Sequence, residues 1–378
     1  MAKVLVTGGL GYIGSHAVVD LSTDGNDVVI IDNLANSSSE VVPRLHQLCA
    51  GSVDFVQGDV RDTELVLSTL QQHNIRAVLH FAGLKAVAES VADPVIYYDN
   101  NVAGLISVLS AMSRANVRNI VFSSSATVYG EPDSSPISED AALRPASPYG
   151  QSKAMCERIL LDTCQSDSAW RAAILHYFNP VGAHASGLLG ESPRGVPNNL
   201  MPYVVQVAAG QRATLSIFGD DYPTPDGTGV RDYIHVCDLA AGHVSAMRYL
   251  TDHAGAVVLN LGTGLPVSVK EMVETFERVN GVAVPRQIAP RRAGDVPVYW
   301  SNPSRAQSLL NWNAQHDVAA MCRDAWAPHV VMQQTLQEKS QTGSESAKRS
   351  STPVTEARYA VDALQNKTQR FESDVSVT

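Results

Sequence analysis

A phenol and an ammonium group four residues apart are the residues of this sequence best suited to proton chemistry. Tyr149 and Lys153 lie in the stretch SPYGQSK, where Ser147 can cap a helix and Pro148 can begin it. Side chains four positions apart share a helix face, so the ammonium would lie one turn behind the phenol. Because a nearby cation stabilises a phenolate, the pair predicts a general base that works near neutral pH. A surface helix pair would look the same, so the other residues must decide.

A glycine-rich turn between a strand and a helix opens the chain. The apolar run 4–6 leads into Gly8, Gly11 and Gly14, and an amphipathic helix follows to about residue 24. Such a turn lets backbone amides approach a pyrophosphate and lets the helix pack against the strand. The pattern predicts a dinucleotide site.

A carboxylate ends the second predicted strand, 28–31. Asp32 is placed to accept both hydroxyls of an adenine ribose and to repel a 2′-phosphate. No Arg or Lys follows it before Arg44, so we predict NAD rather than NADP. An Asp that merely caps a loop is the alternative.

Strands and helices alternate over the first half of the chain at the spacing of right-handed crossovers. Further strands are predicted at 53–56, 77–83, 120–122 and 172–175, with one long helix over 94–116. Ligands bind at the carboxyl ends of such strands, where Asp59, Lys85 and the hydroxyls of 123–127 stand. We predict a doubly wound parallel α/β Rossmann sheet with a smaller α/β substrate-binding lobe.

The regular alternation stops after residue 178, which divides the chain into a predicted NAD-binding domain (1–178) and a second lobe (179–336), with some later segments expected to return to the first domain. The stretch 183–202 is rich in Gly, Pro and Asn and predicts a binding loop with Asn199 at its exit. A helix at 203–209 and a strand at 215–218 follow. Arg231 and Arg292 could clamp a diphosphate, although surface arginines usually do not.

The composition bounds the remaining possibilities. The chain has 378 residues, 44% of them hydrophobic, with a net charge of −10, which argues against a nucleic-acid-binding surface. Its five cysteines form no C-x-x-C pair and no apolar leader or membrane span is visible, so we expect a cytoplasmic protein with reduced thiols. Residues 337–378 are poor in large apolar side chains and are expected to be a disordered tail, apart from a possible short helix at 357–364.

From about residue 3 to residue 326 the chain resembles the extended short-chain dehydrogenase/reductase family, and within it the epimerases that act on UDP-galactose. The resemblance rests on the ordered motifs GGLGYIGSH, HFAGLKAV, YYDNNV, SSSATVYG, SPYGQSK, YFNPVGAH, PNNLMPY, GTGVRDYIHV and PRRAGD. Two departures are Gln151, where Lys is common, and His176, where Arg usually precedes Tyr-Phe-Asn. Neither removes a catalytic group.

The resemblance implies the site residues and the partners. NAD would be held by Gly8, Gly11, Tyr12, Ile13, Gly14, Asp32, Asn33, Asn36, Ser37, Asp59, Val60, Phe81, Ala82, Gly83, Lys85, Asn100, Ser125, Tyr149, Lys153 and Phe178. The UDP-sugar would be held by Lys85, Ser125, Tyr149, Asn179, Asn199, Leu200, Ser216, Phe218, Arg231, Arg292, Asp295 and Tyr299. A homodimer joined by the helices after Pro94 and Tyr149 is implied too, with neither a metal, a nucleic acid nor a membrane as partner.

The implied reaction interconverts UDP-galactose and UDP-glucose in galactose metabolism. Tyr149 would take the proton from the C4 hydroxyl with help from Ser125, while the C4 hydride moves to tightly bound NAD. Lys153 would lower the pKa of the phenol and hold the nicotinamide ribose. The transient 4-keto sugar would then turn over and regain the hydride on its other face.

Three other functions were weighed against this one. A 4,6-dehydratase needs an acid and a base beside Ser125, but Ala126 and Thr127 follow it. A non-catalytic NAD-binding scaffold does not need Ser125, Tyr149 and Lys153 together. An epimerase of N-acetylated UDP-sugars shares every catalytic group, and the phenol of Tyr299 is expected to disfavour it by filling the space beside the sugar C2. Which pathway is served stays open.

Overall fold

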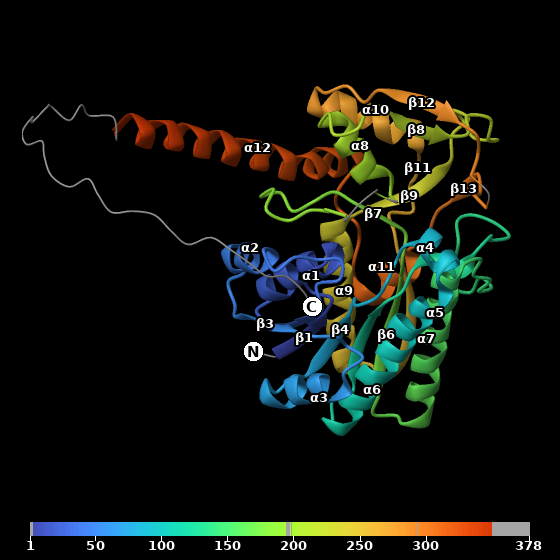
Figure 1. Cartoon of the computed structure of the whole chain (residues 1–378). Coiled ribbons are helices and arrows are strands. Elements are labelled where there is room, and N and C mark those ends of the chain that lie inside the picture. The colour runs from blue at the N-terminus through green and yellow to red at the C-terminus, as the bar shows by residue number, and fades with distance from the viewer. Residues whose placement is uncertain (1–2, 194–196, 198, 293, 350–378) are drawn as a thin grey trace, which may run out of the picture. The chain divides into compact units, whose positions relative to one another are not determined.

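The computed structural model describes residues 3–193, 197, 199–292 and 294–349 (Figure 1). The chain forms two compact units, Met1–Met332 and Gln333–Thr378. The functional site lies in the first unit.

A seven-stranded parallel sheet is the centre of the first unit. Its strand order is β10-β6-β5-β4-β1-β2-β3. The strands are β1 (Lys3–Thr7), β2 (Asp27–Asp32), β3 (Val53–Gln57), β4 (Ala77–His80), β5 (Asn119–Ser123), β6 (Arg171–Tyr177) and β10 (Gly255–Leu261). The predicted strands and the doubly wound parallel arrangement are confirmed. Most of their central residues are Val, Ile, Leu or Ala and are buried on both faces, as a parallel sheet covered by helices requires.

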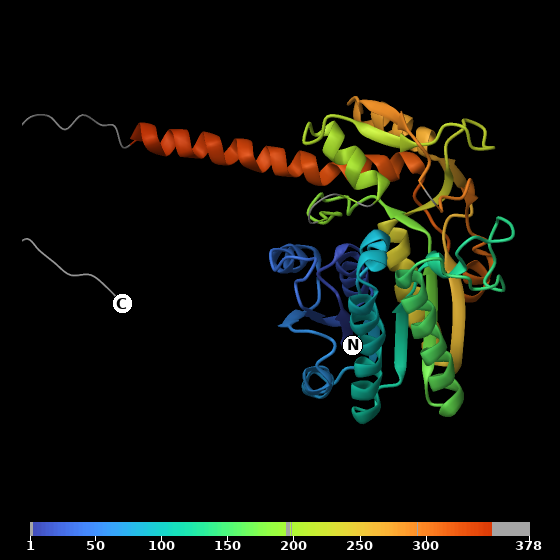
Figure 2. The same cartoon turned by 45° about the vertical axis from the view of Figure 1, so that its right-hand side comes forward.

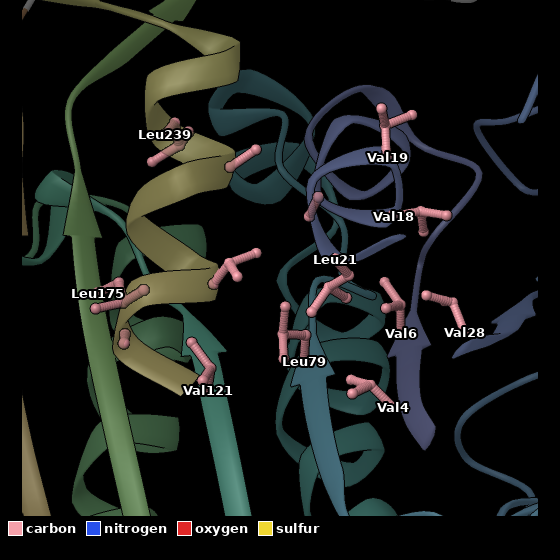
Figure 3. Close-up of a cluster of buried hydrophobic side chains, with 14 of the residues drawn as sticks. Val4, Val6, Val18, Val19, Leu21, Val28, Leu79, Val121, Leu175 and Leu239 are labelled. Atoms are coloured by element: carbon pink, nitrogen blue, oxygen red, sulfur yellow. The ribbon is translucent and has the colours of Figure 1, made fainter. Parts of the chain in front are cut away.

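Two layers of helices cover the sheet. One face carries α1 (Tyr12–Thr23), α2 (Val41–Leu48), α9 (Val236–Asp252) and α11 (Ser304–Leu310), and the other carries α3 (Thr63–Gln72), α6 (Gly104–Arg114) and α7 (Pro148–Ser166). Val4 and Val6 of β1 point toward the first layer, and Leu5 between them points toward the second. In Figure 3, Leu21 of α1 lies beside Leu79 and Val6, while Leu175 lies on the strand that passes α9, the helix that carries Leu239.

The strand order reverses beside β1, and this reversal places the site. The chain runs from β1 outward to β2 and β3, then returns to β4 on the other side of β1. The loops after β1 and β4 therefore diverge at the carboxyl edge of the sheet and leave a crevice there.

The predicted long helix over 94–116 contains a wider turn. It is built from α5 (Pro94–Tyr97), a π-helix η1 (Tyr98–Ala103) and α6, preceded by α4 (Val87–Ala92). The extra residue of a π turn brings Asn101 inward, where its amide oxygen accepts from the backbone N–H of Leu84 at 2.8 Å. Its amide nitrogen donates to the hydroxyl of Ser152 on α7 at 2.9 Å. The irregular turn thus ties the loop after β4 to the helix that carries Tyr149.

Of the elements after residue 178, α9, β10 and α11 belong to the large sheet and its helix layer, and the others form small sheets with their own core. β9 (Val230–His235) pairs with β7 (Asn179–Val181), β11 (Pro266–Ser268) and β13 (Val298–Tyr299), while β8 (Leu215–Phe218) pairs with β12 (Arg286–Ala289). Their helices are α8 (Leu200–Ala208), α10 (Val269–Asn280) and the start of α12 (Val318–Arg349), which contributes Met321 and Cys322 to this core. In Figure 1, α8, β8, α10 and β12 lie together beyond the carboxyl edge of the large sheet.

The helix α12 continues to Arg349, past the expected start of a disordered tail at 337. The residues from 337 to 349 include Gln, Glu, Lys and Ala, which favour helix. Residues 350–378, with the possible helix at 357–364, lie outside the described part of the chain. Among the described residues, no helix is both long and apolar enough for a bilayer crossing.

Candidate functional site

A pocket of about 420 Å³ opens at the carboxyl ends of β1, β2 and β4. Most of the residues predicted to hold a dinucleotide line it. They are Gly8, Gly11, Tyr12, Ile13, Gly14, Asp32, Asn33, Asn36, Ser37, Val60, Phe81, Ala82, Gly83, Lys85, Asn100, Tyr149 and Lys153. Asp59, Ser125 and Phe178 do not belong to its lining.

The glycine turn has room only for glycine. Gly8 has φ +69°, and a Cβ on it would lie 2.7 Å from the backbone nitrogen of Ala82. A Cβ on Gly14 would lie 2.3 Å from the carbonyl oxygen of Gly8, so the first turn of α1 packs directly on the end of β1. This close packing aims the N-terminus of α1 into the pocket, where it favours an anion.

The carboxylate of Asp32 is held in place at the end of β2. Its Oδ2 accepts from the backbone N–H of Leu10 at 3.0 Å, and its Oδ1 accepts from the backbone N–H of Leu34 at 2.9 Å and the hydroxyl of Ser37 at 2.7 Å. Asp32 therefore faces the pocket in one orientation, as a ribose-binding carboxylate must.

Asp59 does not line the pocket, and two neighbouring side chains hold its carboxylate. Its carboxylate accepts from the guanidinium of Arg61 at 2.8 Å and from the amide of Asn33 at 3.1 Å. These partners hold the pKa of Asp59 well below its usual range. Arg61 is two residues away and exposed, so a local ion pair takes the carboxylate, while Val60 beside it lines the pocket.

Tyr149 begins α7 with the cap that its sequence predicts. The hydroxyl of Ser147 accepts from the backbone N–H of Gly150 at 3.2 Å, and Pro148 occupies the first helical position. Tyr149 is 4% exposed and is hydrogen-bonded to Ser125 and to Tyr177.

Ser125 is held as a hydrogen-bond donor. Its Oγ accepts from the backbone N–H of Thr127 at 3.2 Å and from the hydroxyl of Thr127 at 3.0 Å. With its oxygen so occupied, the Ser125 proton is free for Tyr149, and this hydrogen bond lowers the pKa of the phenol. The order Thr127, Ser125, Tyr149 is a short relay that ends on the phenol oxygen.

Burial has the largest effect on the pKa of Tyr149. It raises that pKa well above 10, with a further contribution from Tyr177, so the phenol is neutral in this environment. The Lys153 ammonium donates to the carbonyl oxygen of Ser123 at 2.9 Å and lies 4.8 Å above the centre of the Phe122 ring. Burial lowers the pKa of Lys153, which Cys156 and Glu157 partly offset. The lowering of the phenol pKa by Lys153 stays a prediction.

Several residues predicted to hold the UDP-sugar form a second cluster, outside the pocket lining. The guanidinium of Arg292 donates to Asp295 at 3.0 Å and lies 4.6 Å above the Phe218 ring, and Arg231 lies 3.9 Å from the same carboxylate. Arg231 also donates to the carbonyl oxygen of Val296 at 3.0 Å. The two arginines therefore converge on Asp295.

Tyr299 and Phe178 join this cluster to the proton-transfer residues. Tyr299 pairs with Arg231 across β13 and β9, and its ring centre lies 5.7 Å from that of Phe178. Its phenol donates to the carbonyl oxygen of Ala126, the residue after Ser125. One side of Tyr299 thus belongs to the arginine cluster and the other to the catalytic strand end.

The remaining predicted substrate residues are more scattered. Asn179 is exposed on β7, Leu200 begins α8, and the hydroxyl of Ser216 accepts from Gln287 at 3.4 Å. Asn199 donates to the carboxylate of Glu191 at 3.0 Å.

Tyr177 and Glu191 are among the pocket residues that the sequence reasoning did not predict. Tyr177 lines the pocket and bonds to Tyr149; its position directly before the predicted Phe178 was the available signal. Glu191 also lines the pocket, and its carboxylate accepts from Lys85 at 2.9 Å and from Asn199 at 3.0 Å. It lies in the predicted binding loop, but a carboxylate beside an anion site gives no signal in the sequence.

The arrangement suits proton transfer coupled to hydride transfer. The phenol of Tyr149, which accepts a hydrogen bond from Ser125, lines the same pocket as the glycine turn and Asp32. Ala126 and Thr127, which follow Ser125, have no carboxyl group that could catalyse an elimination. Among the described residues, no group of three or more His, Cys, Asp or Glu side chains is placed to hold a metal ion.

Comparisons with known proteins agree with this geometry. The family model for GDP-mannose 4,6 dehydratase matches residues 5–325. The UDP-glucose 4-epimerase of Neisseria meningitidis serogroup B is 52% identical over 327 residues, which cover 86% of this chain and 96% of that protein.

Two solved structures are similar over nearly the same length. The UDP-glucose 4-epimerase of Stenotrophomonas maltophila, with bound NAD and formylated UDP-arabinopyranose, has a TM-score of 0.87 at 50% identity and covers 89% of this chain and 100% of its own. That of Bifidobacterium longum, in complex with NAD⁺ and UDP, has a TM-score of 0.83 at 46% identity and covers 87% of this chain and 98% of its own. With half of its residues shared over almost the full length of these relatives, the chain belongs to the UDP-glucose 4-epimerase family.

Proposed function

We propose that this protein is an NAD-dependent isomerase that interconverts UDP-galactose and UDP-glucose at the sugar C4. The observation that carries the proposal is the position of Tyr149. Its phenol accepts the Ser125 proton and lines the same pocket as the glycine turn and Asp32. A base and a dinucleotide site in one pocket allow a hydroxyl to lose its proton as its carbon loses hydride.

The residues of the pocket fit NAD. The turn at Gly8 and Gly14 leaves no space for a Cβ, as a close approach of backbone to a pyrophosphate demands. Asp32, oriented by three donors, fits the two ribose hydroxyls and disfavours a 2′-phosphate. When bound, NAD would supply the hydride acceptor for C4 and a positively charged ring near the phenol.

Tyr149 would move the proton of the C4 hydroxyl. Burial favours the neutral phenol, and the positive charges of Lys153 and of the bound cofactor would favour its basic form. Ser125 would hydrogen-bond the C4 oxygen, because Thr127 keeps its proton available. Lys153, fixed by the Ser123 carbonyl, would hold the nicotinamide ribose and place positive charge behind the phenol.

The second lobe would bind the UDP part and leave the sugar free to turn. Arg231 and Arg292 carry the charge that a diphosphate needs, and both now rest on Asp295, which an arriving diphosphate would displace. In this scheme residues 1–178 bind the cofactor and residues 179–336 bind the nucleotide sugar. A 4-keto sugar that pivots about its phosphate link can present either face of C4.

One experiment tests the reaction directly. Purified protein without added cofactor is mixed with UDP-galactose, and the anomeric signals are followed by ¹H NMR. We expect UDP-glucose to appear until both sugars are at equilibrium. An NAD-binding scaffold would give no product, and a 4,6-dehydratase would give a 4-keto-6-deoxy sugar instead, so either result would refute the proposal.

We also propose a homodimer through α5, α6 and α7. These helices expose apolar side chains on one side of the molecule, including Val95 (72% exposed), Ile96 (52%), Ile106 (51%) and Met155 (40%). Ile106 and Met155 share a shallow apolar depression with Tyr98, and α6 and α7 lie side by side in both views (Figure 2). A second copy of the chain would cover this surface.

The dimer can be tested by one charge on its proposed interface. Ile106→Glu should halve the mass measured by light scattering, because it buries a carboxylate in an apolar contact. Leu309→Glu, at a similarly exposed site on α11, is the control and should leave the mass unchanged. A monomeric wild type would refute the dimer.

The five free cysteines are consistent with a cytoplasmic setting, where thiols stay reduced.

A further inference from the structure

A buried polar network lies directly behind the proton-transfer residues and has no part in the proposed chemistry. Ser124, Tyr129, Glu157, His176 and Asn260 are each at most 3% exposed. They come from five places in the fold: the end of β5, the 3₁₀ helix η2 (Ala126–Tyr129), α7, β6 and β10. Burying a polar group costs free energy unless it forms hydrogen bonds. Each donor and acceptor of this network is therefore expected to have a partner.

The contacts form one chain. The Glu157 Oε1 accepts from the hydroxyl of Ser124 and lies 2.9 Å from His176 Nε2. His176 Nδ1 lies 2.7 Å from the phenol oxygen of Tyr129. That phenol lies 2.8 Å from the amide oxygen of Asn260.

Counting protons along this chain assigns the donor at each contact. The Asn260 amide nitrogen donates to the carbonyl oxygen of Ile137 at 2.9 Å, so the amide oxygen faces Tyr129. That oxygen only accepts, and the single phenol proton goes to it. The phenol oxygen must then accept from Nδ1–H of His176. At the other end, one proton lies between Glu157 and Nε2, and we place it on the imidazole because a free imidazole binds a proton more tightly than a free carboxylate.

We propose that His176 is a doubly protonated imidazolium, paired with the Glu157 carboxylate, and that this pair positions the catalytic residues. Three members of the network are next to residues of the proton-transfer site. Ser124 precedes Ser125, His176 precedes Tyr177, and Glu157 lies one helical turn after Lys153. The pair thus links the three backbone segments that carry the reacting hydroxyls and the ammonium. This positioning role rests on the proposed epimerase function, whereas the protonation state does not.

The pair also accounts for the departure of this sequence from its family at position 176. An arginine there would offer Glu157 a permanent cation with several N–H donors. An imidazolium offers the same charge and the two donors that this network uses. His176 therefore replaces an arginine only as long as it keeps both protons.

The charges around the pair are few. Lys153 and Cys156 lie on α7 beside Glu157, and Tyr129 of η2 bonds to the ring. The more distant carboxylate of Glu139 accepts from the backbone N–H of Asn260 at 2.8 Å. It lies 3.7 Å from the guanidinium of Arg305, which balances its charge. If His176 became neutral, Glu157 would be an uncompensated anion one turn from Lys153. It would then raise the proton affinity of Tyr149 and move activity to higher pH.

The protonation state is measured without turnover. In protein labelled with ¹⁵N-histidine, the His176 signals are assigned by their loss in His176→Gln. We expect both ring nitrogens to be protonated from about pH 6.5 to about pH 8.5, well above the range in which an ordinary histidine loses its charge. In Glu157→Gln, one of them should lose its proton. A bare ring nitrogen in the wild type at about pH 7.5 would overturn the proposal.

The positioning role is tested by matched variants. His176→Gln keeps two N–H donors and removes the charge, so we expect kcat to fall about tenfold or more with KM within about threefold, and the pH profile to move upward. His176→Arg restores the charge and should recover most of kcat and the wild-type profile. If the arginine variant behaves like the glutamine variant, charge pairing does not position the site.

A folding defect would be informative as well. Should His176→Gln melt early, the double variant His176→Gln/Glu157→Gln should melt at a higher temperature, because it no longer buries a lone carboxylate. No recovery would contradict an ion pair. If the wild type lacked epimerase activity, the kinetic part would fail with the proposed function, whereas the NMR result would still decide the charge of His176.

Discussion

Tyr299 donates a hydrogen bond to the backbone carbonyl of Ala126, a residue 173 positions earlier in the chain. Ala126 directly follows Ser125, so the bond fixes the Tyr299 ring against the strand end that carries the catalytic hydroxyl. Burial raises the pKa of Tyr299 above its usual value, and the phenol remains a donor at neutral pH. A ring anchored in this way is a wall of the proposed sugar site.

The first prediction concerns substrate choice. If this wall lies beside the sugar C2, an acetamido group there would overlap the ring, at a cost of about 1–3 kcal/mol, or about 10- to 100-fold in kcat/KM. We expect the wild type to discriminate against UDP-N-acetylglucosamine and Tyr299→Cys to narrow the ratio of kcat/KM values between the two substrates. Tyr299→Phe keeps the ring and loses only the hydrogen bond, so it should keep most of the discrimination. Efficient wild-type turnover of the N-acetylated sugar would show that Tyr299 does not close the site.

The second prediction concerns the phenol. Tyr149→Phe keeps the ring that packs 6.4 Å from Tyr97 and removes the proton-transfer group. We expect kcat to fall at least about 100-fold, as for loss of a general base, with little change in melting temperature. Steady-state rates and thermal melts of the same preparations check both parts. Retention of more than about a tenth of the wild-type rate would mean that the proton goes elsewhere.

The third prediction separates Lys153 from Tyr149. Lys153→Ala removes the cation behind the phenol together with the hydrogen bond that the Lys153 ammonium donates to the carbonyl oxygen of Ser123. Activity should fall about 100-fold or more, and the remaining activity should require higher pH, because the phenol ionises less readily without a nearby cation. A pH–rate profile distinguishes this from Tyr149→Phe, whose residual rate should show no such shift. An unchanged profile in Lys153→Ala would remove the ammonium from the proton step.

The fourth prediction is that the protein keeps NAD through purification. A cycle that restores its cofactor gains nothing by releasing it, and the glycine turn and Asp32 hold the site in one shape. Heat-denatured protein should release close to one NAD(H) per chain, measured by enzymatic assay. Asp32→Ala should release much less. Activity that depends on added NAD in the wild type would contradict this cycle.

The fifth prediction is a loss of stability in mild acid. Burial lowers the pKa of His16 and His80 to about 3 and that of His235 and His243 to about 4. Between these values and about 6.5 the unfolded chain binds protons that the folded chain does not, so stability is full above about pH 6.5 and falls as the pH decreases. Each such histidine contributes up to about 1.4 kcal/mol per pH unit.

Melting temperatures from pH 7.5 down to pH 5 test this. His243→Gln should make the decline less steep, because this fully buried ring no longer has to stay neutral. His253→Gln, at an exposed position, is the control and should leave the slope unchanged. A melting temperature that stays constant over this range would contradict the assignment of these rings as neutral.

The sequence predicted the part of the fold that depends on local patterns. A short apolar run such as 28–31, which lies between a glycine turn and a polar loop, has the length of a strand. Ser147 and Pro148 together mark the start of a helix from local sequence alone. The glycine spacing predicted part of the pocket lining because Gly14 meets the backbone of Gly8 and Gly9 within the same turn. These features need no knowledge of distant residues.

What the sequence did not predict depends on contacts between distant segments. The π turn at Tyr98–Ala103 exists because Asn101 bonds to Leu84 and Ser152. The raised pKa of Tyr149 follows from burial by several elements, and a spacing of four residues to Lys153 says nothing about it. Glu191 accepts a hydrogen bond from Lys85, 106 residues away in the chain, and Asp59 pairs with Arg61. The spacing of residues in the sequence does not predict which partner a charged side chain takes.

The edge strand β10 has a consequence for synthesis on the ribosome. It pairs with β6 along its whole length, and α9, just before it, packs on α1 from the start of the chain. A nascent chain of 178 residues would expose β6 as an open edge and leave the apolar side of α1 uncovered. The NAD-binding sheet is therefore complete only after residue 261 has left the exit tunnel. A fragment cut after residue 178 would keep β6 as an unpaired edge and should aggregate rather than fold.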